Sequence, residues 1–269
     1  MTEPTSKFPI RRYRRGKVEE LQDLVAVEEP LEIRIAGEPF QVLMRLPGYE
    51  KELALGFLHT EGIIAGLSEV ITLHFCGTAT DPVLAPNVVD VQLTDAARAR
   101  VGRRHLEVAY SGCGLCAKEA VSEISQKVPP VKSELTIGAE ALLALMARLE
   151  ESQPVYRDTG GTHAVALATP DGETFLQAED VGRHNAMDKV IGRALLEKRN
   201  LGALVALLSG RLSFEMALKC VRAGIPILAA VSAPTTMALE LARELHLTTV
   251  GFAREGRLNI YTHPRRIIS

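Results

Sequence analysis

Helical and apolar strand segments alternate through the C-terminal half of this 269-residue chain, and this alternation limits the fold more than any other feature. Helical spacing covers residues 185–198, 214–223 and 235–245. Nearly continuous apolar runs, which are typical of strands buried on both faces, cover 203–208, 227–231 and 248–252. The pattern predicts an α/β fold with a parallel, doubly wound layer, covered by helices on both faces and connected by right-handed crossovers.

The chain before residue 128 has a different, strand-rich pattern. Segments 31–35 and 40–46 predict a hairpin around Gly37, segment 50–64 a helix, and 71–75, 88–93 and 105–109 short strands. Val128-Pro129-Pro130 is the expected linker, because two prolines cannot continue a helix. A helix over 138–151 and a hairpin of 162–168 with 174–177 follow.

We therefore expect three regions. Residues 1–20 read as a basic flexible arm, 21–128 as a strand-rich mixed N-terminal portion, and 131–269 as an α/β portion that binds a cofactor.

The composition is that of a soluble globular protein, with 46% hydrophobic residues, 24% charged residues and a net charge of -2. The small net charge argues against nucleic acid as a partner. No apolar run approaches the roughly 20 residues needed to span a bilayer, and no secretory signal is evident. Because four cysteines do not make a disulfide framework in a chain of this length, we expect a cytoplasmic protein.

Polar residues follow each strand of the predicted parallel layer, at 209–213, 232–236 and 253–257. Ligands of open α/β sheets bind at the carboxyl ends of the strands, where helix N-termini present free N–H groups. Ser213 and Thr235 also suit ordinary helix N-caps. Caps do not require Arg211, Arg254 and Arg257, whose guanidinium groups match phosphate geometry. We expect an anionic, nucleotide-like ligand at this edge.

Two further polar clusters precede predicted elements, at 160–163 and 179–185. Arg183 is a candidate phosphate ligand, and His163 and His184 are candidate hydrogen-bond donors or proton-transfer groups. Asp180 and Asn185 also suit helix caps. A single histidine is more often structural than catalytic, so neither histidine identifies a site alone.

Cys113-Gly114-Leu115-Cys116 places two thiols close together on a glycine-rich segment, which favours accessible sulfur. Structural zinc needs four ligands, and the available companions are His74 and Cys76, far upstream. Zinc deaminases need a His-x-Glu and a Pro-Cys-x-x-Cys, which this chain lacks.

A thioredoxin-like pair would lie near a βαβ pattern, whereas this one follows a mixed strand region. Sulfur carriage by a thiolate also fits. The cysteine pair alone does not choose among these chemistries. We expect no metal site, and we expect Cys76 and Cys220 to pack as small hydrophobic residues.

Several motifs occur in order between about residues 30 and 266. They are Ser111-Gly112-Cys113-Gly114-Leu115-Cys116, Gly160-Gly161-Thr162-His163, Glu179-Asp180-Val181-Gly182-Arg183-His184-Asn185-Ala186-Met187-Asp188-Lys189-Val190, Ser209-Gly210-Arg211, Val231-Ser232-Ala233-Pro234-Thr235-Thr236, and Val250-Gly251-Phe252 with Tyr261-Thr262-His263-Pro264. Together they resemble the formate dehydrogenase accessory sulfurtransferases of the FdhD type. The long run from Glu179 is the most specific of them.

The resemblance implies a cytoplasmic, homodimeric sulfur carrier. It implies that the chain takes persulfide sulfur from a cysteine desulfurase and passes it to the molybdenum cofactor before insertion into formate dehydrogenase. It places the persulfide on Cys113, with Cys116 as a supporting thiol. It also implies a cytidine-deaminase-like, three-layer αβα C-terminal part without catalytic zinc, and a smaller mixed α/β N-terminal part.

The resemblance further implies a contact segment for bis(molybdopterin guanine dinucleotide), for which a guanine nucleotide would be a surrogate. Its residues are Phe252, Ala253, Arg254, Glu255, Gly256 and Arg257. We expect supporting roles for His163, Arg183, His184, Ser209 and Arg211. The alternatives are a non-catalytic chaperone that binds and delivers the molybdenum cofactor, and a zinc-stabilised interaction module.

Overall fold

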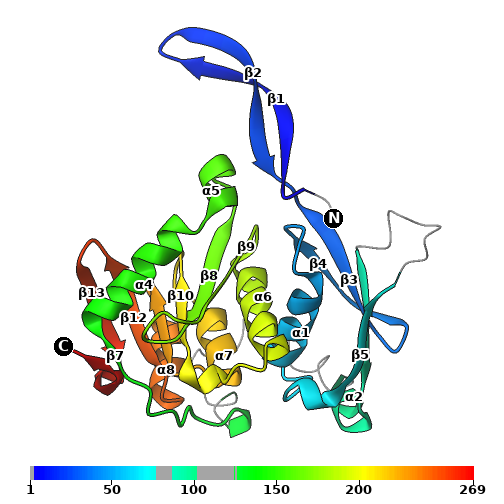
Figure 1. Ribbon diagram of the computed structural model, residues 1–269, viewed down its shortest axis with the longest axis vertical. Helices are drawn as coiled ribbons and strands as arrows, with labels where there is room; N and C mark the ends of the chain where they lie inside the picture. The colour runs from blue at the N-terminus through cyan, green and yellow to red at the C-terminus, as the bar shows by residue number, and fades with distance from the viewer. Residues whose placement is uncertain (1–2, 77–86, 102–123, 125) are drawn as a thin grey trace.

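The computed structural model describes residues 3–76, 87–101, 124 and 126–269 (Figure 1). Cys113, Cys116, the predicted strand 105–109 and nearly all of the predicted helix after Cys116 lie outside the described residues.

The C-terminal part is built on a six-stranded sheet with the order β13-β12-β11-β10-β8-β9. Its strands are β8 (His163–Ala168), β9 (Phe175–Asp180), β10 (Val205–Leu208), β11 (Ile227–Ala230), β12 (Thr248–Arg254) and β13 (Arg257–Thr262). Strands β10, β11 and β12 are parallel, as the alternation of helix and strand predicts. The predicted helices and strands of residues 138–252 are all present, with ends shifted by a few residues.

The other half of this sheet is antiparallel, and it includes the predicted hairpin of β8 with β9. Strands β8 and β9 pair antiparallel with each other, β8 pairs antiparallel with β10, and β13 pairs antiparallel with β12. Short connections join β8 to β9 and β12 to β13, and a turn of a few residues can join only antiparallel neighbours. The pairing of β8 with β10 has no such local cause, because β9 and α6 lie between them in the chain. Strand β13 was not predicted. The sequence analysis ended the last strand at residue 252 and read 253–257 as a loop, whereas β12 continues to Arg254 and turns directly into β13.

Helices cover both faces of this sheet (Figure 1). Helix α4 (Ala139–Glu151) packs on one face, and α6 (Arg183–Leu196), α7 (Phe214–Arg222) and α8 (Thr236–Glu244) pack on the other. Each face has its own apolar core, and successive strand residues such as Ala206 and Leu207 contribute to opposite cores. The three-layer arrangement is therefore present, and its likeness to cytidine deaminases stays a prediction.

The N-terminal part contains a second sheet with the order β4-β3-β6-β5. Its strands are β3 (Glu29–Ile35), β4 (Glu38–Arg45), β5 (Val70–Phe75) and β6 (Val88–Leu93), and they confirm the predicted hairpin and short strands. Helices α1 (Glu50–Thr60) and α2 (Asp95–Val101) pack on one face of this sheet, around a core that includes Leu31, Leu53 and Val91.

The expected flexible arm forms a regular hairpin instead. Strands β1 (Thr5–Arg14) and β2 (Lys17–Ala26) pair over ten positions and project away from the rest of the molecule (Figure 1). Arg15 and Gly16 both have positive φ, as two-residue hairpin turns require. Basic residues of β1 lie opposite acidic residues of β2, and Arg11 contacts Glu20 at 3.0 Å. Ten paired positions and a regular turn therefore form an ordered hairpin in a segment whose composition suggested disorder, with exposed charge pairs across the strands.

A close backbone contact joins the two parts, and we call it the junction. A Cβ added to Gly56 of α1 would lie 1.8 Å from the carbonyl oxygen of Asp188 in α6, and one added to Gly192 would lie 1.8 Å from that of Glu52. Two glycines therefore let α1 and α6 approach backbone to backbone.

Among the described helices, none is long and apolar enough to cross a membrane.

Candidate functional site

The polar segments selected from the sequence meet at one edge of the six-stranded sheet. Parallel strands β10, β11 and β12 end there, antiparallel β8 begins there, and His163 pairs with Asp180 at the end of β9. The loops after β10 and β11 touch through a bridge between Leu212 and Pro234. We call this edge the carboxyl edge.

Arg183, His163 and Arg211 share one end of the carboxyl edge. Arg183 is the first residue of α6, and its Nε is buried without a hydrogen-bond partner among the described residues. His163 lies beside Gly210, whose added Cβ would be 3.6 Å from its Nδ1. Arg211 is exposed in the same loop. Within the described part of the chain, neither arginine has an ion-pair partner, although both are charged.

Burial and neighbouring cations favour the neutral form of both histidines. Burial lowers the pKa of His163, and the positive charges of Arg183 and Arg211 lower it further. Burial also lowers the pKa of His184, as do Arg183 and Lys219, whereas Glu215 and Glu61 oppose them. At neutral pH the two imidazoles are therefore mainly hydrogen-bonding groups rather than cations.

The segment from Phe252 to Arg257 forms a hairpin that extends past the ends of the neighbouring strands. Phe252 has a φ of 51° within an irregular stretch of the β12–β13 pairing, and its N–H donates to Ser232 O at 3.2 Å. Ala253 is buried and Phe252 is half-buried, whereas Arg254, Glu255, Gly256 and Arg257 are exposed. Arg254 and Arg257 lie opposite each other across the Glu255-Gly256 turn.

The arginines of this hairpin and those near His163 lie at opposite ends of the carboxyl edge. Three strand spacings separate β12 from β8, which corresponds to about 14 Å. The edge can therefore contact an extended anion at both of its ends.

Three residues with hydroxyl side chains lie at the carboxyl edge, at positions set by the ends of its strands and helices. Ser209 Oγ accepts a hydrogen bond from Ala164 N at 2.9 Å and so extends the pairing of β8 with β10. Ser213 and Thr235 are the N-cap residues of α7 and α8, but neither side chain makes a capping hydrogen bond.

Most of the long motif that begins at Glu179 builds structure. Glu179 accepts hydrogen bonds from Val155 N, Tyr156 N and Thr162 Oγ1, and so caps the start of α5 (Pro154–Thr159).

Asp180 binds the N-terminal part rather than a ligand. It pairs with Lys189 at 2.8 Å and accepts a hydrogen bond from Leu46 N. Lys189 donates to Leu46 O, and Asn185 donates to Met44 O. Burial lowers the pKa of Lys189, and Asp180 opposes that change.

A second buried ion pair lies at the junction and is bonded to the N-terminal part through Thr60. Lys219 Nζ lies 2.8 Å from Asp188 Oδ1, and Thr60 Oγ1 of α1 hydrogen-bonds to both side chains. Burial raises the pKa of Asp188, and the Lys219 ammonium opposes that rise. Sequence reasoning missed Thr60 and Lys219, because they lie 128 and 31 residues from Asp188 and no local spacing relates them to it.

The two described cysteines differ from each other. Cys220 is fully buried in the core, as predicted, and burial raises the pKa of its thiol far above the usual range. The expectation that Cys76 packs as a hydrophobic residue is wrong. Cys76 is half-buried next to His74 and Asp90, because it continues β5 on the sheet face that α1 does not cover.

Fold and edge together define a mixed α/β protein with a cationic sheet edge. Residues 26–268 match the FdhD/NarQ family, and the chain belongs to this family. It is 45% identical to "Sulfur carrier protein FdhD" of Mycolicibacterium paratuberculosis over 98% of both chains, and 40% identical to the protein of the same name from Saccharolobus solfataricus over 97% of both.

A solved structure supports the fold. It is that of a protein described as a formate dehydrogenase accessory protein from Desulfotalea psychrophila, with a TM-score of 0.79 and 24% identity over 99% of this chain and 100% of that one.

Proposed function

We propose that this chain is a cytoplasmic sulfur carrier required for formate dehydrogenase activity. The Cys113 thiolate attacks the outer sulfur of a cysteine desulfurase persulfide, and the desulfurase thiolate leaves. The sulfur then passes to the molybdenum cofactor, which is the substrate held at the carboxyl edge before its insertion into formate dehydrogenase. In this proposal the chain acts as a homodimer, and Cys116 supports Cys113.

The single observation that carries the binding half of this proposal is the buried Arg183 Nε without a partner at the carboxyl edge. A buried donor without an acceptor is costly, and a phosphate oxygen would supply the acceptor. His163 and His184 lie near enough to Arg183 to feel its charge, and Arg211 acts on His163 in the same way. Arg254 and Arg257 offer a second cationic position on β12 and β13, several strands away across the sheet. This spacing suits a large pterin–nucleotide with separated charges.

The sulfur half rests on the cysteine pair and on the names of the relatives. Mass spectrometry of the chain after incubation with desulfurase and cysteine should show one added sulfur on Cys113. Cys113→Ala should abolish maturation of formate dehydrogenase in cells and keep its affinity for guanosine diphosphate. Full dehydrogenase activity with Cys113→Ala would contradict the carrier role and leave the chaperone alternative.

The binding half has a separate test. Arg183→Gln should weaken guanosine diphosphate binding about tenfold, because a hydrogen bond to a charged group contributes about 1.5–3 kcal/mol. Arg193→Gln is the matched control, since Arg193 lies on the same helix but pairs with Glu197 at 3.0 Å. Calorimetry that finds equal affinity for both variants would exclude Arg183 from the site, whatever the persulfide result.

A further inference from the structure

A group of three metal-ligating side chains lies outside the carboxyl edge. Among the described residues, His74, Cys76 and Asp90 are the one set of at least three such residues whose ligand atoms all lie within 4.8 Å of one another. This set includes neither Cys113 nor Cys116, and nothing in the proposed sulfur chemistry uses it.

The pairing of β5 with β6 brings the three side chains together. His74 lies directly opposite Asp90, and Cys76 N donates to Val88 O at 2.8 Å, so the pairing continues past the end of β5. Because side chains alternate along a strand, His74 and Cys76 share a face with Asp90. The opposite face carries Leu73, Val89 and Val91 of the core against α1, so the three ligands lie on the face away from that helix.

The donor types select the class of cation. A thiolate, an imidazole and a carboxylate suit zinc or cobalt, whereas calcium and magnesium prefer oxygen ligands alone. Ligand atoms of a tetrahedral zinc site lie about 3.3–3.8 Å apart, given zinc–ligand distances of about 2.0–2.3 Å. Closure by roughly 1 Å brings the present group to that geometry. His74 is exposed, and a change of rotamer at the surface can move its side chain by this amount.

The carboxylate of Asp90 is already held in position. Asp90 is 4% exposed, its Oδ1 accepts from Gly37 N at 2.7 Å, and its Oδ2 accepts from Gln92 Nε2 at 2.9 Å. These two bonds leave further lone pairs for a cation, and such outer hydrogen bonds are what orient metal ligands. The nearest guanidinium, that of Arg34, is paired with Glu32 at 2.7 Å.

We propose that His74, Cys76 and Asp90 form a zinc-class site that fastens the edge strand β5 to β6. Three protein ligands leave the fourth tetrahedral position to water. On binding, the Cys76 thiol releases its proton to solvent and the sulfur bonds to the cation, with no change of oxidation state.

Cobalt(II) added to the full chain tests this site. Every protein tested also carries Cys113→Ser and Cys116→Ser, so that these two thiols cannot bind the cobalt. One equivalent of cobalt should give a thiolate charge-transfer band and the visible absorption of tetrahedral cobalt. Cys76→Ser should abolish the charge-transfer band. Asp90→Asn should weaken binding at least tenfold, whereas the control Asp95→Asn, on α2, should leave affinity unchanged.

A second variant, His74→Gln, is included in case Asp90→Asn misfolds, because His74 is exposed and is not part of the described apolar core of this sheet. It should also weaken binding at least tenfold while circular dichroism stays that of the parent chain. A charge-transfer band that survives Cys76→Ser would overturn the proposal. So would no band in the parent chain, or equal affinities of His74→Gln and Asp95→Asn.

Discussion

The junction and the carboxyl edge use the same kinds of side chain for opposite purposes. At the junction each ammonium has a carboxylate: Lys189 pairs with Asp180, and Lys219 pairs with Asp188, all nine-tenths or more buried. At the carboxyl edge, a few residues away in sequence, Arg183 has a buried Nε without any acceptor in the described chain. Arg45 and Arg266 also have one buried nitrogen without a partner, but ion pairs or hydrogen bonds hold the rest of each guanidinium. Arg183 differs from them because it lies at the carboxyl edge and has no ion-pair partner among the described residues.

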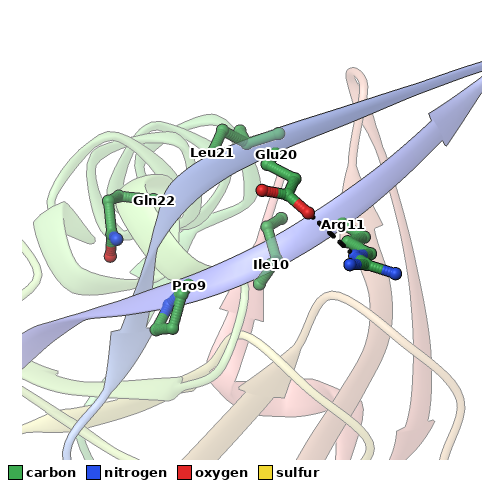
Figure 2. Close-up of a pocket in the computed structure, with 6 residues that line it drawn as sticks. All are labelled: Pro9, Ile10, Arg11, Glu20, Leu21 and Gln22. Atoms are coloured by element: carbon green, nitrogen blue, oxygen red, sulfur yellow. Dashed lines mark hydrogen bonds and ion pairs between the residues drawn. The ribbon is translucent and has the colours of Figure 1, made fainter.

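A pocket on the β1–β2 hairpin can be compared with the carboxyl edge as a possible ligand site. It is lined by Pro9, Ile10, Arg11, Glu20, Leu21 and Gln22, which all belong to the hairpin (Figure 2). Its two charged residues, Arg11 and Glu20, are about three-quarters exposed and bind each other. A hollow lined by side chains that already satisfy one another offers little to a charged ligand, so this pocket is a weaker candidate than the carboxyl edge.

Removal of a buried charge at the junction should have the largest effect. Lys219→Met leaves the Asp188 carboxylate buried without its cation, which should lower the free energy of unfolding by about 3–5 kcal/mol. Urea denaturation measures this change. Arg193→Gln, which breaks a partly exposed pair with Glu197, should cost less than about 0.5 kcal/mol. Similar losses for both variants would remove the distinction between the junction and the surface.

Disruption of the close backbone contact between α1 and α6 should cause the next largest loss in the free energy of unfolding. Gly56→Ala places a methyl group 1.8 Å from the carbonyl oxygen of Asp188, where a backbone atom cannot give way, so we expect a loss of about 3 kcal/mol. Gly66→Ala is the control, because an added Cβ there meets nothing within 4 Å. If thermal or urea unfolding shows no difference between the two variants, the close approach of α1 and α6 is wrong.

The smallest expected effect is the change of guanosine diphosphate affinity with pH, which we attribute to the two histidines of the carboxyl edge. The pKa values of His163 and His184 are lowered, so both are neutral at pH 7.5 and gain charge only below their usual value of about 6.5. Each added charge should contribute about 1 kcal/mol to phosphate binding, which is roughly fivefold in affinity.

The measurement is the ratio of guanosine diphosphate affinities of the parent chain and a His163→Gln, His184→Gln double variant. The ratio removes the ligand's own titration, and it should rise as the pH falls from 7.5 to 5.5. A ratio that stays constant would show that neither imidazole faces the phosphates.

Local pattern predicted most of the secondary structure, because alternation, helical spacing and turn residues act within a few positions. The β3–β4 hairpin, the parallel core β10-β11-β12 and the helices between its strands follow from such signals. The hairpin of β8 with β9 follows from its turn residues as well, whereas the antiparallel pairing of β8 with β10 and the presence of β13 did not follow from local signals. They depend on which strand finds a partner at a sheet edge, which is a long-range contact.

The sequence by itself determined the family motifs and the gathering of polar loops at the carboxyl ends of the parallel strands, since strand direction places those loops at one edge. Only the tertiary structure decided the roles within the run from Glu179 to Val190. Asp188 and Lys189 lie one turn or more beyond Arg183 on α6, so α1 and the core cover them while Arg183 stays at the sheet edge. Partners such as Leu46, Thr60 and Lys219 are brought to these charges by folding alone, and burial in their company separates a structural charge from a binding one.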